Sequence, residues 1–225
     1  MHLEVLVTDS AEAVTAQQAG ATRLELVSEM ERGGLTPPPQ TVQSVVHSVT
    51  IPVHVIVRPH DDGFVYDRAQ RQAILRNAAR LRDLGVSGVA FGALDAAGHV
   101  DTEFVQEVLS VSRLPMTFHR AFDSTPSLSA SYATLAAIEG VERVLSAGGA
   151  DNAWDGRYWL RELCCGNTTP HILGAGAIDS QNVEALIGFT GLREVHVGRG
   201  ARTDGSLDAG KIERIARLMK LPIRS

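Results

Sequence analysis

The amino-acid sequence predicts a single domain over residues 1–225 with the fold of a TIM-type (β/α)8 barrel. The first observation behind this prediction is a set of eight short apolar runs spread along the chain. The second is that a stretch with helical periodicity follows each run, which is the pattern of a parallel sheet covered by helices. The third is the length of 225 residues, which suits one barrel. An open doubly wound sheet is the alternative, because alternation by itself does not reveal closure.

The predicted strands are the apolar runs. In chain order they are Leu3–Val7, Arg23–Val27, Val53–Val57, Gly88–Phe91, Met116–Phe118, Arg143–Leu145, His171–Leu173 and Glu194–Val197. Polar or charged residues lie inside or just after several of them. In barrels of this type the chemistry lies at the carboxyl ends of the strands, so these residues are the first candidates for a site.

The predicted helices begin and end at residues with clear capping preferences. They run from the Asp9–Ser10 cap to Ala19, onward from Pro37–Pro39, over Asp67–Leu84, through Phe104–Val111, over Leu128–Glu139, over Ala153–Cys165, from an Asp179 cap through Ile187, and through Ile212–Met219. Glycine follows the first and third helices at Gly20 and Gly85, as expected for a helix end.

Composition narrows the class of protein. The chain is 44% hydrophobic and 21% charged, with a net charge of −5, and it lacks the basic stretches typical of nucleic-acid binding. No apolar stretch approaches the roughly 20 residues that a bilayer span requires. The two cysteines, Cys164 and Cys165, are adjacent and are expected to stay reduced. Together with a strand at the very N-terminus, these features predict a cytoplasmic protein that binds neither membranes nor nucleic acid.

The third predicted strand carries His54 and Arg58 on one face, because strand side chains alternate. Valines occupy the other face and suit contact with the helices. This pattern places His54 inside the barrel and Arg58 at its mouth. A buried arginine requires a partner, so Arg58 is expected to contact either an interior glutamate or an anionic ligand.

The fifth strand leads into His119, Arg120 and Asp123. A histidine beside an arginine and an aspartate is typical of acid–base chemistry, because its neighbours set its pKa. We therefore predict His119 and Asp123 as catalytic candidates and Arg120 as a ligand-binding residue. The structural alternative is that Asp123 caps the following turn and neutralises Arg120.

Glu4 and Glu25 interrupt the first two apolar runs. Carboxylates are almost never buried without a partner, so we expect them to face Arg58 and His54 across the interior. We therefore predict a polar layer beneath the mouth, made of Glu4, Glu25, His54, Arg58 and His119. This layer is either a functional site, in which Glu25 is a catalytic candidate, or a structural network.

Glycine-rich turns follow the late strands, including Gly174-Ala175-Gly176 and Gly198-Arg199-Gly200. Loops after the seventh and eighth strands of many barrels bind phosphate, so Gly174 and Gly176 are candidates for anion binding. His196 in the last run is a further ligand-binding candidate or a core histidine. Cys164 and Cys165 offer soft ligands for Cu(I), but packing is the preferred explanation, because adjacent cysteines do not both face one site.

These segments resemble the CutC family, whose proteins are named for copper homeostasis. The segments that carry the resemblance include Gly33-Gly34-Leu35-Thr36-Pro37, Ile51-Pro52-Val53-His54, Thr117-Phe118-His119-Arg120-Ala121-Phe122-Asp123 and Glu194-Val195-His196. It implies a TIM-type barrel, a cytoplasmic location, a homo-oligomer (dimer or tetramer) and a role in copper handling. Copper is the only cofactor that the resemblance implies.

The sequence departs from the family pattern at two positions. Several family members carry a cysteine two residues after the first-strand glutamate and another after the second-strand Glu-Leu, where this chain has Leu6 and Val27. Thiolates are the preferred ligands of Cu(I), so the departure disfavours copper at that place.

Three interpretations of function remain. The chain is a CutC-like protein of undefined molecular activity linked to copper, or a barrel enzyme with lyase or isomerase chemistry on a small anionic or phosphorylated metabolite. In the third interpretation the polar layer is structural and the barrel serves protein–protein contact. Metal ligands cannot be assigned from the sequence.

Overall fold

A computed structural model describes residues 1–165 and 169–221. Its centre is a closed barrel of eight parallel strands, in which β1 pairs with both β2 and β8. The strands are β1 (His2–Val7), β2 (Arg23–Leu26), β3 (Val53–Ile56), β4 (Gly88–Phe91), β5 (Met116–Phe118), β6 (Val141–Ser146), β7 (His171–Gly174) and β8 (Glu194–Val197). Closure confirms the predicted TIM-type barrel and excludes the open sheet.

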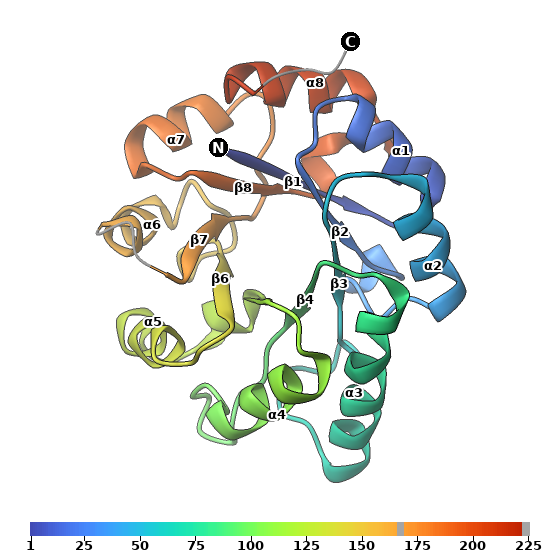
Figure 1. The fold of residues 1–225 in the computed structure, drawn as a ribbon. Helices are drawn as coiled ribbons and strands as arrows, with labels where there is room; N and C mark the ends of the chain where they lie inside the picture. Colours follow the sequence, from blue (N-terminus) through green and yellow to red (C-terminus); the bar gives the residue numbers. More distant parts are fainter. Residues whose placement is uncertain (166–168, 222–225) are drawn as a thin grey trace.

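The α-helices surround the barrel in chain order, as the view along its axis shows (Figure 1). They are α1 (Ser10–Gln18), α2 (Pro39–Ser48), α3 (Arg68–Leu81), α4 (Thr102–Ser112), α5 (Leu128–Ala136), α6 (Arg157–Cys164), α7 (Val183–Thr190) and α8 (Ala209–Leu218). Each helix returns the chain to the starting end of the barrel, so all strands end at the same rim.

The observed first residues of the helices confirm most of the N-terminal caps that the sequence predicts. The Asp9 carboxylate accepts the N–H of Glu12, and Asp67 forms a reciprocal capping box with Gln70. The predicted Asp179 cap is wrong: α7 follows Asn182, and the Asp179 carboxylate accepts the N–H of Gln181 in a turn before the helix. Aspartate stabilises such turns as readily as it caps helices, which explains the error.

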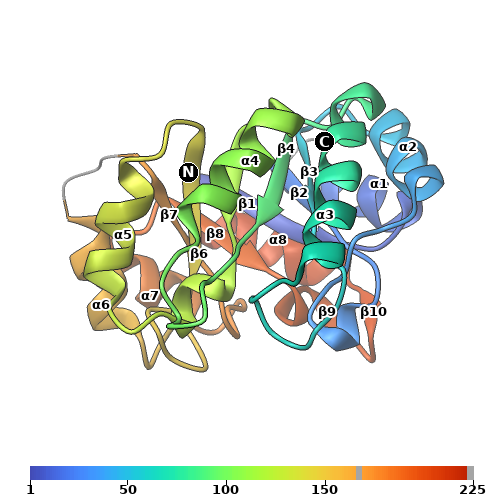
Figure 2. The same cartoon turned by 90° about the horizontal axis from the view of Figure 1, so that it is seen from below.

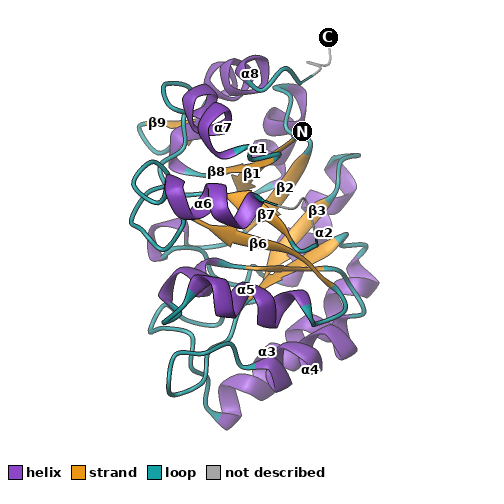
Figure 3. Cartoon of the chain, turned by 90° about the vertical axis from the view of Figure 1, so that its left-hand side faces the viewer, coloured by secondary structure: helices purple, strands orange, loops and turns teal. Residues whose placement is uncertain are grey.

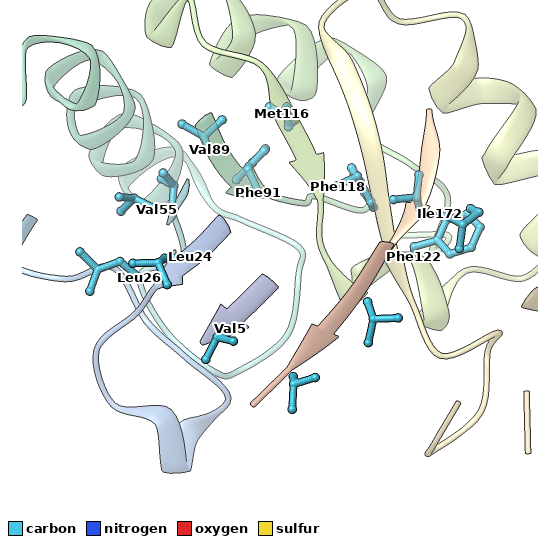
Figure 4. Packing of buried hydrophobic residues seen from close by; sticks show 14 of the residues in the cluster. Val5, Leu24, Leu26, Val55, Val89, Phe91, Met116, Phe118, Phe122 and Ile172 are labelled. Atoms are coloured by element: carbon cyan, nitrogen blue, oxygen red, sulfur yellow. The ribbon is translucent and has the colours of Figure 1, made fainter. Parts of the chain in front are cut away.

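Strand alternation divides the buried side chains into two sets, as the sequence predicts. Outward-facing residues such as Val55, Leu24 and Phe91 pack beneath the helices (Figure 4). Inside the barrel, Leu6, Val27, Ile56 and Ala90 form a separate apolar cluster with Met30.

A short hairpin between β8 and α8, formed by β9 (Arg202–Thr203) and β10 (Ser206–Leu207), has no counterpart in the predicted elements. Figure 2 shows it at the edge toward which β4 points. Arg202 joins it to α1 through an ion pair with Glu12. Across the described residues, no helix is both long enough and apolar enough to cross a membrane.

Candidate functional site

A cavity of about 400 Å³ opens at the carboxyl ends of the strands. Its ionisable lining residues are Glu25, Arg58, His119, Arg120, Asp151, His196 and Arg199. The remaining wall is mostly apolar or glycine. Arg58 and His119 both lie at this cavity, on Phe64: the Arg58 guanidinium carbon and the His119 ring centre are each 5.2 Å from the centre of the Phe64 ring.

His119 follows the last residue of β5 and is 4% exposed. Its Nδ1 accepts the backbone N–H of Ala121 at 3.2 Å, which leaves Nε2 buried without a hydrogen-bond partner among the described residues. The ring lies against Gly92, where a Cβ would be 2.5 Å from Nδ1. Burial, together with the charge of Arg58, lowers the pKa of His119 to about 3, so the imidazole is neutral at neutral pH.

Arg58 has no carboxylate partner within ion-pairing distance among the described residues. Its Nη1 donates long hydrogen bonds to the carbonyl oxygens of Gly33 (3.4 Å) and Arg32 (3.5 Å). Its guanidinium lies over the Phe64 ring. The expected pairing with an interior glutamate is therefore wrong, and the charge of Arg58 is available to a ligand at the mouth.

Asp123 makes no hydrogen bond with His119 and does not line the cavity. Its carboxylate binds Arg120 (Nε–Oδ2, 2.8 Å), Ser146 (Oγ–Oδ1, 2.6 Å) and the backbone N–H groups of Ala147 and Gly149. The predicted trio of His119, Arg120 and Asp123 does not form. Asp123 instead has the contacts of the structural alternative, because the short 3-10 helix after His119 directs it toward the loop after β6.

The two interior glutamates pair with residues other than those expected. Glu4 contacts Arg23 (Oε2–Nε, 2.5 Å) and His196 (Oε1–Nδ1, 2.8 Å). Glu25 has no hydrogen bond within the part of the chain that the structure describes, and its Oε2 is 3.8 Å from His196 Nε2. Neither carboxylate is paired with Arg58 or His54.

Arg23 is the interior partner that the sequence interpretation missed. It also binds Glu194 at 2.8 Å, and Glu194 in turn binds Arg143 at 2.8 Å. Arg23 lies two residues before Glu25 in β2, and Glu194 two before His196 in β8. Strict alternation would have placed both inside the barrel, so the signal was present.

These contacts set the ionisation of the interior groups. Burial raises the pKa of Glu25 to about 7. Burial alone would also raise the pKa of Glu4, but the charges of Arg23 and His196 hold it below its usual value. For His196, burial would lower the pKa, and the carboxylates of Glu25 and Glu4 raise it instead.

His54 lies in the barrel interior, as predicted, but it does not line the cavity. Its Nδ1 is 3.5 Å from Thr117 Oγ1, and its ring covers Gly88, where a Cβ would be 2.6 Å from Nε2. Burial lowers the pKa of His54 to about 4.

Some glycines of the predicted turns support strand packing, and others line the cavity. Gly174 ends β7 against Leu192, away from the cavity, whereas Gly176 and Gly200 line it. A Cβ at Gly200 would be 2.0 Å from the Ile178 carbonyl oxygen, so the loops after β7 and β8 are in direct contact. For the backbone N–H of Arg199 and of Gly200, the described chain offers no hydrogen-bond partner.

One group of side chains in the described residues can hold a metal ion. The nearest ligand atoms of Glu4, Glu25 and His196 lie within 4.8 Å of one another. Their donors are carboxylate and imidazole. Where some CutC proteins carry cysteines, Leu6 and Val27 pack with Met30, and neither Cys164 nor Cys165 lines the cavity. A thiolate site for Cu(I) therefore does not fit this cavity.

Comparisons with known proteins agree on the family. The family model of CutC matches residues 1–201. A family protein CutC of Enterobacter sp. (strain 638) is 36% identical over 202 residues, which are 89% of this chain and 81% of that protein.

Solved structures agree on the fold. The crystal structure of a protein named for copper homeostasis, CutC from Streptococcus agalactiae, superposes with a TM-score of 0.82 at 25% identity, covering 88% of this chain and 98% of that one. Phosphoribosyl anthranilate isomerase from Thermotoga maritima has a TM-score of 0.66 at 13% identity and covers 98% of both chains, which reflects a shared barrel fold. On the family model and the relatives together, this chain belongs to the CutC family.

Proposed function

We propose that this chain is an enzyme that binds a small anionic metabolite in the cavity and moves a proton on it. The observation that carries the proposal is the unpartnered His119 Nε2, which is buried in the wall of a cavity that also holds Arg58. Buried polar atoms are normally hydrogen-bonded, so an unpaired one on a residue that lines a cavity is best explained by a ligand.

The charged rim supports an anionic ligand. Arg58, which lacks a carboxylate partner in the described chain, would bind the anion, and Arg120 and Arg199 line the same cavity. The free N–H groups of Arg199 and Gly200, in the loop after β8, add donors at the place where many barrels bind phosphate.

His119 would act through its Nε2 hydrogen. Because Nδ1 accepts the backbone N–H of Ala121, the hydrogen of the neutral ring is on Nε2, which is therefore a donor. Burial and the charge of Arg58 lower the pKa of His119, so the ring is neutral when a ligand binds. Nε2–H would donate to a carbonyl oxygen of the metabolite and stabilise the negative charge that forms there when an adjacent C–H loses its proton, as in lyase or isomerase reactions.

Ligand binding to single-site variants tests the proposal. Thermal-shift measurements with inorganic phosphate and a set of small phosphorylated and carboxylated metabolites should reveal at least one compound that raises the melting temperature of the wild type. Arg58→Met should weaken that compound's binding at least about tenfold, as expected for a lost charge-assisted contact. His119→Asn should bind the compound but should not exchange its protons with deuterated solvent.

Arg76→Met is the matched control, because Arg76 is exposed on α3 and does not line the cavity. It should bind the compound like the wild type. The proposal fails if no compound binds, or if Arg58→Met binds as tightly as the control.

We also propose that the chain works in the cytoplasm as a homo-oligomer. Cys164 and Cys165 are free thiols, which is the usual state in a reducing compartment. Trp154, Tyr158 and Trp159, in and just before α6, are each more than 40% exposed, and contact with a second copy would cover them. Figure 3 shows α6 on the side of the barrel that faces the viewer. Light scattering of the purified chain should give a multiple of 24.1 kDa; a monomer at all concentrations would contradict the oligomer.

A further inference from the structure

Glu25 is the one interior carboxylate of the described barrel that lacks a guanidinium partner. Glu4 pairs with Arg23, and Glu194 pairs with both Arg23 and Arg143. Three carboxylates against two guanidinium groups leave one negative charge, and that charge lies on Glu25. Because a buried charge without a partner is costly, Glu25 requires either a proton or a cation.

His196 offers a nitrogen ligand directly beside this charge. A carboxylate only accepts hydrogen bonds, so the 2.8 Å contact with Glu4 Oε1 requires the hydrogen on His196 Nδ1. In the neutral ring the lone pair is then on Nε2, the atom that faces Glu25. Metal-binding histidines in proteins are commonly oriented in this way, by a carboxylate that accepts from the nitrogen not bound to the metal.

The separation of the two ligand atoms also fits an ion. His196 Nε2 and Glu25 Oε2 are 3.8 Å apart, too far for a hydrogen bond. Two atoms that each lie about 2.1 Å from one ion can be up to about 4.2 Å apart, so a single cation can contact both. Both residues line the cavity, which leaves room for water or ligand oxygens to complete the coordination.

We propose that Glu25 and His196 bind one divalent cation such as Zn²⁺ or Mn²⁺ at the floor of the cavity, with Glu4 orienting His196. Imidazole and carboxylate donors suit these ions better than Cu(I). Glu25 is then a metal ligand instead of a base. The inference rests on the proposed function only in that the open coordination positions face the same anionic ligand; cation binding itself does not need that ligand.

Titration of the metal-free protein tests the site. The wild type, dialysed against a chelator, should bind one equivalent of Zn²⁺ by calorimetry, and Co²⁺ should give visible absorption bands characteristic of its coordination. Glu25→Gln and His196→Gln should each lose the calorimetric signal and the absorption. Glu4→Gln should lower the affinity about 10- to 100-fold, as expected for the loss of an orienting carboxylate.

His119→Asn is the matched control, because His119 lines the same cavity without contacting Glu25 or His196 and should retain full Zn²⁺ affinity. Circular dichroism of every variant identifies any that fails to fold, and Glu25→Asp provides a second variant that keeps a carboxylate and should keep weakened binding.

The inference is overturned if the wild type binds neither Zn²⁺ nor Co²⁺, or if Glu25→Gln binds them unchanged. It is also overturned if Zn²⁺ binding requires Cys164 or Cys165, because neither cysteine lines the cavity. If Zn²⁺ binds but none of the anionic compounds does, the proposed function fails and this inference stands. If an anionic compound binds but neither Zn²⁺ nor Co²⁺ does, this inference fails and the proposed function stands.

Discussion

At the scale of single residues, two buried histidines differ in what they face. His54 lies against Thr117 and Gly88 and does not line the cavity, whereas His119 lines it and has an unpaired Nε2. Burial lowers the pKa of both, to about 4 and about 3 respectively. Burial therefore keeps both imidazole rings neutral at neutral pH. The two histidines differ because only His119 lines the cavity and has a ring nitrogen free for a ligand.

His54→Asn should change how stability depends on pH. The unfolded chain protonates His54 near pH 6.5, but the folded chain does so only near pH 4, so the wild type loses stability as pH falls through this window. The loss attributable to His54 is about 2 kcal/mol between pH 7.5 and pH 5. Urea unfolding of both proteins should show the free energy of unfolding of the variant rising relative to the wild type by about that amount. An offset that is the same at both pH values would refute the assignment.

At the scale of secondary-structure elements, close contacts between neighbouring strands position the site. Gly88, the first residue of β4, and Gly92, the residue after it, carry no side chain, and the rings of His54 from β3 and of His119 after β5 occupy the space. These two glycines thus decide where both histidines lie.

Gly92→Ala should displace the His119 ring, because the added Cβ would be 2.5 Å from Nδ1. Overpacking of this kind costs about 1–3 kcal/mol. The histidine resonances in NMR spectra should shift, and binding of the cavity ligand should weaken. Gly188→Ala, at an exposed position of α7 with no atom near the new Cβ, should leave both unchanged. Equal behaviour of the two variants would contradict this account.

Asp67→Ala tests the start of α3. The variant loses the hydrogen bond that the Asp67 carboxylate accepts from the Gln70 N–H, whereas the backbone N–H of residue 67 can still donate to the Gln70 side chain. Its free energy of unfolding should therefore fall by about 1 kcal/mol. Asp83→Ala, near the other end of the same segment and without a capping contact, should change it by less than about 0.5 kcal/mol. Denaturant unfolding measures both, and similar losses would exclude a specific capping contribution.

At the scale of the whole molecule, the charged interior joins strands that are far apart in the sequence. Arg23 from β2 holds Glu4 from β1 and Glu194 from β8, and Arg143 from β6 also binds Glu194. These contacts lie where β1 and β8 close the barrel. We therefore expect the chain to unfold as one cooperative unit.

Arg23→Met should cost about 3–5 kcal/mol, because it leaves buried carboxylates without their main countercharge. The exposed Arg76→Met should cost less than about 0.5 kcal/mol. Fluorescence and far-UV circular dichroism should report the same urea midpoint for each protein if the barrel is one unit. A loss below about 1 kcal/mol for Arg23→Met would mean that the network contributes little to stability.

The sequence by itself determined the eight strand-and-helix units and much of the cavity lining, whereas closure of the sheet into a barrel came from the structure. Periodicity is a local property: eight apolar runs with helical stretches between them specify the elements, and strand alternation assigns Glu4, Glu25 and His54 to the interior. The rim position of Arg58 and His119 follows from the rule that all strands end on the same side.

Only the tertiary structure decided which of these residues meet. Which side chains pair inside a closed barrel depends on the register between strands that are far apart in the sequence. In the structure, Glu4 pairs with Arg23 and His196, and Asp123 binds the loop after β6. Glu25 and His119 Nε2 have no hydrogen-bond partner in the described chain. A side chain's neighbours on other strands are set by distances in space, and no local pattern in the sequence encodes them.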